Sequence, residues 1–170
     1  MNSYNFFLKY KVPTKYFDDI EATLDLIYEA GCDDAMVNYG TTGIIKLDCD
    51  TTAGSAQDAF DIMSAKFKKA IPEARLVEAG PDLVEATEIA RVMGVSRQRF
   101  RQLFTQNADS FPHYIHGGST QVWHLAQVIG WVLSNNRTLA KGDANQLFDL
   151  SRAAMKFNKA TTEELLRELH

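Results

Sequence analysis

Residues 86–105, ATEIARVMGVSRQRFRQLFT, have the spacing of two short helices joined by a turn at Gly94. Ala90 is small enough for the two helices to cross closely, and Gly94 supplies the backbone freedom that a tight turn needs. The polar residues of the stretch are then forced outward, as in a helix-turn-helix. Four apolar side chains can share one small core: Ile89, Val95, Phe100 and Leu103.

The second of these helices is expected to begin near Ser96, which can cap it while the first amides offer a site for a phosphate oxygen. A 3.6-residue repeat puts Phe100, Leu103 and Phe104 on one stripe. Arginine can bond guanine and glutamine can bond adenine in pairs, while other guanidiniums neutralise phosphates, so we expect DNA contacts here. The alternative is an amphipathic surface helix with solvated polar residues. The expected DNA-binding residues of this helix are Ser96, Arg97, Gln98, Arg99, Arg101, Gln102 and Thr105.

Length and composition favour a globular protein of one domain or two small ones. The chain has 170 residues and is 45% hydrophobic, which is ample for packed cores and excludes a disordered protein. No stretch approaches the roughly 18 continuous apolar residues that span a bilayer. The start, MNSYNFFLKYKVP, lacks the features of a signal peptide, so we expect a cytoplasmic protein without membrane contact.

The charge of the chain is distributed unevenly. The net charge is −4, but residues 1–80 carry 8 Lys and Arg against 13 Asp and Glu, whereas residues 81–170 carry 10 against 9. Residues 91–141 hold six basic groups and only one acidic group, Asp109. Such a basic patch on an acidic protein predicts DNA affinity that depends on both salt and sequence.

No metal, cofactor or enzyme motif is expected. Cys32 and Cys49 have no CxxC partner, which favours reduced packing residues over a zinc site or a disulfide. His113, His116 and His124 lack the spacing of a metal site, and wing or hairpin positions are the better interpretation of them.

Two pairs of acids could suggest a magnesium-dependent nuclease, namely Asp33 with Asp34 and Asp48 with Asp50. Both pairs lie beside expected strand ends, where solvated turn acids are ordinary. The sequence contains no GxxxxGK[ST], GxSxG or HExxH pattern, so we expect a protein that is not an enzyme.

The first 80 residues predict an α+β unit of the order βαββαβ, which resembles the ferredoxin-like fold. Gly80-Pro81 marks the expected boundary with the next domain, residues 81–135. The expected elements are a strand over 4–12, a helix between 13 and 31, strands over 34–38 and 42–48, a helix over 56–71 and a strand over 74–79.

After the helix pair, residues 111–123 have β-prone flanks around Gly117-Gly118 and predict a β-hairpin wing. Residues 124–134 then show helical spacing, with Trp131 adding a large apolar face, and should close the core of this domain.

Three segments, EIARVMGVSRQRFRQLF (88–104), FPHYIHGG (111–118) and VWHLAQVIGWV (122–132), resemble the winged helix-turn-helix of the MerR, excisionase and AlpA group of bacterial and phage DNA-binding proteins. The resemblance covers roughly residues 82–135. It implies that the second helix enters the major groove and that the wing touches flanking DNA. The long coiled-coil helix of MerR regulators is absent, and the domain before the module is unusual for the excisionase and AlpA proteins. By position, the resemblance assigns Ser96, Arg97, Gln98, Arg101 and Gln102 to the reading helix and His113, His116 and Thr120 to the wing.

The last segment, residues 136–170, predicts two helices after a polar linker. One follows Gly142-Asp143, and Thr161-Thr162-Glu163-Glu164 is expected to cap the other, Leu165–Leu169. Packing onto the same chain and a dimer contact are both open for this segment.

These features favour a sequence-specific double-stranded DNA-binding protein, either a repressor or an antitoxin-like autoregulator. One such module reads about a half-site, so we expect a homodimer on an inverted repeat. One alternative is a protein-interaction module that binds a toxin or effector through residues 1–80. Another is a ligand-sensing regulator, although Phe6, Tyr10, Tyr16 and Tyr39 are better explained as core or edge aromatics.

Overall fold

The computed structural model describes residues 1–169, and the chain forms two compact units of mixed α and β structure. Unit 1 comprises Met1–Gly80 together with the chain from Lys156 onward, and unit 2 is Pro81–Met155. The first junction falls at the Gly80-Pro81 dipeptide named above. No helix in residues 1–169 combines the length and the apolar character needed to cross a bilayer.

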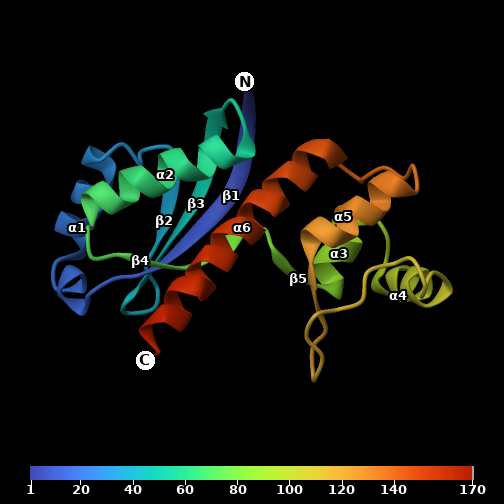
Figure 1. The fold of residues 1–170 in the computed structure, drawn as a ribbon. Coiled ribbons are helices and arrows are strands. Elements are labelled where there is room, and N and C mark those ends of the chain that lie inside the picture. Colours follow the sequence, from blue (N-terminus) through green and yellow to red (C-terminus); the bar gives the residue numbers. More distant parts are fainter. Residues whose placement is uncertain (170) are drawn as a thin grey trace. The chain divides into compact units, whose positions relative to one another are not determined.

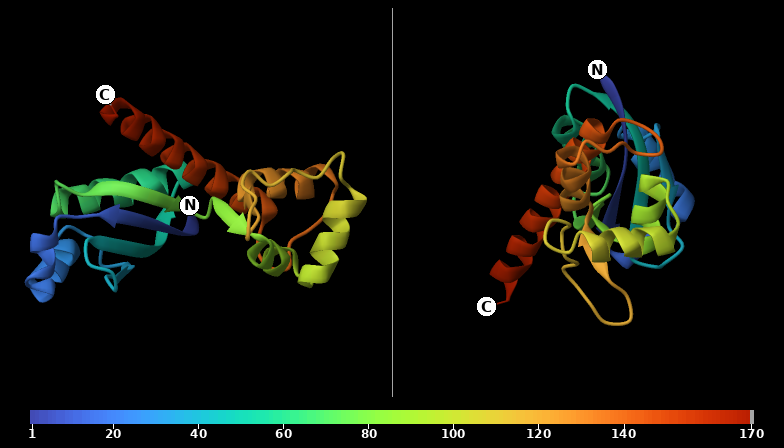
Figure 2. Two further views of the ribbon diagram at one scale, coloured as in Figure 1. Left: turned by 90° about the horizontal axis from the view of Figure 1, so that it is seen from below. Right: turned by 90° about the vertical axis from the view of Figure 1, so that its right-hand side faces the viewer.

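Unit 1 contains a four-stranded antiparallel sheet in the order β2-β3-β1-β4 (Figures 1 and 2). The strands are β1 (Asn2–Lys11), β2 (Ala35–Asn38), β3 (Ile44–Ala53) and β4 (Arg75–Gly80). All four expected strands are confirmed, and β3 continues beyond the expected range. Alternate residues of β1 and β3 are buried, as the period of two in a strand requires.

The helices of unit 1 are η1 (Thr14–Phe17, a 3₁₀ turn), α1 (Ile20–Glu29) and α2 (Ala56–Ala70). The helix expected between residues 13 and 31 is confirmed in α1, but it begins later than expected, because the Asp19 carboxylate accepts the amide of Ala22 at 3.1 Å and starts α1 as a helix separate from η1. The helix expected over 56–71 is confirmed, and it lies over the strands in Figure 1. Its fully buried face consists of Ala59, Phe60, Met63 and Phe67.

The last helix, α6 (Ala144–Glu168), is continuous, so the expectation of two helices and a cap at Thr161-Thr162 is wrong. The two threonine hydroxyls donate instead to carbonyls one turn earlier, of Phe157 at 3.0 Å and of Asn158 at 3.1 Å. No glycine or proline interrupts residues 144–168. The helix therefore begins in unit 2 and ends in unit 1.

Within unit 1, the second half of α6 covers the edge strand β4. The side chain of Asn158 accepts the amide of Ala79 and donates to its carbonyl, each at 2.7 Å. Phe157 packs beside Phe60, with ring centroids 5.3 Å apart. Asn158 thus pairs backbone groups that an open sheet edge would expose.

Unit 2 contains α3 (Ala86–Met93), α4 (Arg97–Gln106), α5 (Leu125–Ser134) and a two-stranded sheet. The sheet pairs β5 (Leu83–Glu85) with β6 (Val122–His124). The expected hairpin over 111–123 is therefore corrected: the partner of β6 is β5, a strand that the sequence analysis missed.

A loop over residues 115–121, called here the 115–121 loop, precedes β6 and projects from unit 2 (Figures 1 and 2). It is closed at its base by a single bridge between His116 and Val122 and by the amide of Ile115, which donates to the Val122 carbonyl at 2.8 Å.

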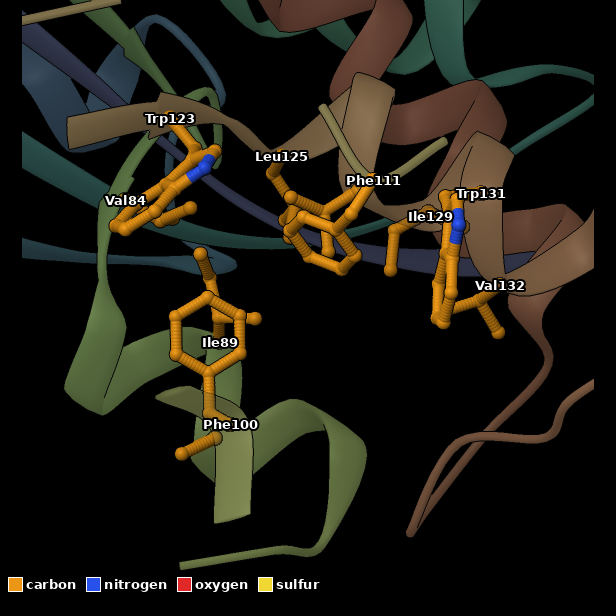
Figure 3. Packing of buried hydrophobic residues seen from close by; sticks show 11 residues of the cluster. Val84, Ile89, Phe100, Phe111, Trp123, Leu125, Ile129, Trp131 and Val132 are labelled. Carbon is orange, nitrogen blue, oxygen red and sulfur yellow. The ribbon is translucent and has the colours of Figure 1, made fainter. Parts of the chain in front are cut away.

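One aromatic-rich core joins these elements of unit 2 (Figure 3). Trp123 and Phe100 meet edge to face with centroids 5.3 Å apart, and Phe111 packs against Trp131 at 4.9 Å. Ile89 and Phe100 extend toward the Trp123 side of the cluster, so α3 and α4 are anchored to the small sheet and to α5.

The two cysteines lie inside unit 1, where both are buried and free. Burial raises the pKa of Cys32 to about 11 and that of Cys49 to about 12. Both thiols stay protonated at neutral pH, which agrees with packing residues and opposes a reactive role.

Candidate nucleic-acid interface

The turn between α3 and α4 depends on Gly94 and Ser96. Gly94 has φ +71°, and its amide donates to the Arg91 carbonyl at 3.2 Å. Ser96 then starts α4, because its hydroxyl accepts the amide of Arg99 at 3.0 Å. The prediction of two short helices joined by a glycine turn is confirmed.

The buried stripe of α4 decides which of its residues face outward. Phe100 and Leu103 are 1% and 2% exposed, and Phe104 packs edge to face on Trp123 at 5.7 Å. The polar residues of the helix fall on the remaining circumference and are exposed. This separation follows the periodicity found in the sequence.

A cleft of about 590 Å³ lies between α4 and the 115–121 loop. From α4, the side chains of Arg97, Arg101 and Thr105 line it, and Phe100 and Phe104 contribute apolar lining. One flank of α4 thus presents two guanidiniums and a hydroxyl to the cleft.

The 115–121 loop and the start of α3 form the facing wall of this cleft, and only some of their lining residues were expected to contact DNA. Thr120 was expected, whereas Ser119, Gln121 and Thr87 were not. Ser119, Thr120 and Gln121 follow Gly118, where φ is +137°. Thr87 lies in the first turn of α3. The run Gly-Gly-Ser-Thr was the one available signal for the loop residues.

The other exposed residues of α4 do not line the cleft. Gln98, Arg99 and Gln102 lie on a different flank, and an Arg99 guanidinium N–H donates to the Gln102 amide oxygen at 3.4 Å. We call these three residues the open flank. The expected contact residues of α4 are therefore divided between two surfaces.

The arginines of α4, Arg97, Arg99 and Arg101, form no ion pair with the carboxylates that the structure describes. Glu85, at the start of α3, is the acidic group that lines the cleft. Unpaired guanidiniums on an exposed helix form a favourable site for phosphates or base edges.

The three residues expected in the wing, His113, His116 and Thr120, lie in different surroundings. Of these three, Thr120 lines the cleft. The His113 ring nitrogen bonds the Tyr114 carbonyl at 3.0 Å, and its ring lies 3.9 Å from that of Tyr114 and 5.8 Å from that of Phe104, so His113 packs beside the cleft without lining it. His116 is held by its backbone in the bridge with Val122 and is exposed.

His124 has a structural partner. Its Nδ1 lies 2.6 Å from a carboxylate oxygen of Asp82, which is only 2% exposed, and the Asp82 carbonyl accepts the amide of Leu125 at 2.7 Å. This pair ties the start of β5 to the start of α5.

The remaining basic groups of the patch lie near the α3–α4 turn or on the core. Arg137 covers the Trp131 ring at 5.1 Å. The amide of Ala140 donates to the Val92 carbonyl at 3.1 Å, which brings the neighbouring Lys141 to the turn.

One of the two acid pairs in unit 1, Asp48 with Asp50, is engaged in local contacts. Asp48 bonds Asn38 at 2.7 Å and pairs with Lys46 at 3.3 Å, while Asp50 accepts the hydroxyl of Ser3. Within the described part of the chain, no three His, Cys, Asp or Glu side chains are grouped as a metal site would require.

Comparison of the whole chain with family models, with curated proteins and with solved structures produced no match.

Proposed function

We propose that this chain is a sequence-specific double-stranded DNA-binding protein that regulates transcription, as a repressor or an antitoxin-like autoregulator. The observation that carries the proposal is the exposed surface of α4, where Arg97, Arg99 and Arg101 lie beside two glutamines and form no ion pair within residues 1–169. Guanidinium and carboxamide groups are the side chains best suited to reading base edges in the major groove.

The proposal assigns a winged helix-turn-helix to unit 2, with α4 as the reading helix and the 115–121 loop as the wing. The Gly94 turn, the buried face of α4 and the cleft between helix and loop support it. Unit 1 is proposed to be ferredoxin-like, which the βαββαβ order and the strand order β2-β3-β1-β4 support.

A single module of this kind reads about a half-site, so the proposal includes a homodimer on an inverted repeat. The contact is proposed to lie within residues 1–80 or at the leucine-bearing end of α6, beyond Lys159. In support, Leu165 and Leu166 in the last turn of α6 are 53% and 60% exposed, and Leu169, directly after the helix, is 78% exposed.

Selection of bound duplexes from a randomised pool tests the proposed function. We expect enrichment of one sequence, with an affinity that falls as salt rises. The triple variant Arg97→Ala, Arg99→Ala, Arg101→Ala should lose the enrichment. A matched variant, Arg152→Ala, Lys156→Ala, Lys159→Ala, removes the same charge from the exposed surface of α6 and should retain it. A wild-type chain that enriches no sequence at any salt concentration would refute the proposal.

The second candidate is a protein-interaction module that binds a toxin or effector through unit 1. The exposed leucines at the end of α6 are the observation in its favour. A purified candidate partner that binds the wild type and the triple arginine variant equally, with no DNA affinity in either, would favour this candidate.

A further inference from the structure

The two flanks of α4 face different environments. Arg97 and Arg101, one helical turn apart, line the cleft toward the 115–121 loop. Gln98, Arg99 and Gln102 form the open flank and do not line it. A ligand that fills the cleft and a ligand that lies along the open flank would therefore meet different side chains.

Duplex DNA has a matching division. A helix fits the major groove, about 12 Å wide, whereas a narrow loop suits the minor groove, about 6 Å wide. One sugar-phosphate strand separates the two grooves. If α4 occupies the major groove and the 115–121 loop approaches the adjacent minor groove, this strand must pass through the space between them, which is the cleft.

The groups lining the cleft fit a phosphodiester strand better than base edges. The guanidiniums of Arg97 and Arg101 carry charge, and Ser119 and Thr120 bring hydroxyl donors on the opposite wall. Glu85 lines the same cleft beside the start of α3, so the phosphate is expected on the α4 side, away from this carboxylate.

The open flank has the groups needed to distinguish bases. Gln98 and Gln102 each present a carboxamide that can donate and accept at once, and the Arg99 guanidinium lies within hydrogen-bonding distance of Gln102. This contact places the Arg99 guanidinium and the Gln102 carboxamide side by side on the open flank.

We infer that Arg97 and Arg101 hold the sugar-phosphate strand in the cleft, while Gln98, Arg99 and Gln102 determine the base sequence that is read. The inference rests on the proposed function and divides its residues into two classes. All five side chains are exposed, so their replacement leaves the core of unit 2 intact.

Titration of two duplexes by fluorescence anisotropy tests the inference: the selected site, and a scrambled duplex of equal length and composition. Arg97→Ala and Arg101→Ala should weaken binding to both duplexes by the same factor. Each should reduce the slope of log K against log salt by about 1. Gln98→Ala and Gln102→Ala should lower affinity for the selected duplex alone, by about 5- to 150-fold.

Conservative variants sharpen the comparison. Arg101→Lys keeps a point charge and should retain most of the affinity for both duplexes, whereas Arg99→Lys loses the planar guanidinium and should lose sequence preference. Arg152→Ala, which removes an exposed arginine elsewhere in unit 2, is the control for charge and should leave preference and slope unchanged.

The outcomes separate this inference from the proposed function. If Arg97→Ala or Arg101→Ala changes the preferred bases, or if the glutamine variants weaken both duplexes alike, the division is wrong although DNA binding stands. If the wild type prefers no duplex, the proposed function fails and the division fails with it.

Discussion

Gly94 is the residue on which the position of α4 depends most directly. Its φ is +71°, and a Cβ at this position would lie 2.7 Å from the Cβ of Ala140. We expect Gly94→Ala to destabilise unit 2 by about 1–2 kcal/mol through the left-handed backbone, and by more through the contact with Ala140. Urea unfolding followed by tryptophan fluorescence measures this loss of stability, since Trp123 and Trp131 both lie in unit 2.

Two comparisons separate the causes of this loss. Gly142 also has a positive φ, +80°, but a Cβ there meets open space, so Gly142→Ala should show the backbone effect alone. Adding Ala140→Gly to Gly94→Ala should recover the part due to contact. Equal losses at positions 94 and 142 would contradict the role assigned to Ala140.

The pair formed by Asp82 and His124 is expected to stabilise unit 2. Asp82 is 2% exposed and lies 2.6 Å from His124 Nδ1, so His124→Ala leaves a buried carboxylate with less compensation. We expect a loss of about 2–4 kcal/mol in the free energy of unfolding of unit 2, measured by the same fluorescence assay.

An exposed histidine serves as the control for this substitution. His113→Ala should change stability by less than about 0.5 kcal/mol. Asp82→Asn in the His124→Ala background should recover stability, because it removes the buried charge. Strictly additive losses in the double variant would show that the two side chains are not coupled.

At the scale of elements, the continuity of α6 reverses the stability change expected for Thr162→Ala. If Thr162 belonged to a helix cap, Thr162→Ala would cost about 0.5–2 kcal/mol. Thr162 instead lies inside a continuous helix and is exposed, so the same change should stabilise unit 1 by a few tenths of a kcal/mol. Urea unfolding followed by far-ultraviolet circular dichroism measures the change.

A true cap in the same unit is the matched control. Ser55 accepts the amide of Asp58 at 3.1 Å and begins α2, so Ser55→Ala should destabilise unit 1 by about 1 kcal/mol. Losses of similar size at positions 55 and 162 would indicate a helix boundary near Thr162.

Periodicity predicted those elements whose own residues carry the signal. Alternation predicted β1, and the spacing of Phe60, Met63 and Phe67 predicted α2, because each pattern is complete within one segment. Strand β5 has three residues, too few for a pattern, and its partner lies about 40 positions later. Such pairing depends on the tertiary fold, which a local window does not contain.

For the candidate site, the sequence predicted the exposed face of α4 but not how that face is divided. The exposed residues of α4 follow from the buried positions of Phe100 and Leu103, which are visible in the sequence. Their division between cleft and open flank depends on where the 115–121 loop lies. For that reason Thr87, Ser119 and Gln121 were missed, while the DNA contact expected for His113 stays a prediction.

At the scale of the whole molecule, we expect net charge to be a poor guide to the proposed DNA affinity. The chain carries −4, but the acidic excess belongs to residues 1–80, and three arginines of α4 have no acidic partner within residues 1–169. Charges beyond about 10 Å are largely screened at 0.1 M salt. Groups that line the cleft should therefore affect binding more than the total charge does.

Glu85 allows this argument to be tested, because its carboxylate lines the cleft. Glu85→Gln should raise affinity for the selected and scrambled duplexes alike, by about 1.5- to 5-fold at low salt, and the gain should shrink as salt rises. Asp33→Asn changes the net charge equally but alters an exposed residue of unit 1, so it should have no measurable effect. Anisotropy titrations at several salt concentrations measure both. An equal gain from the two substitutions would mean that total charge governs the affinity, and the cleft would then have no special part in holding the phosphate strand.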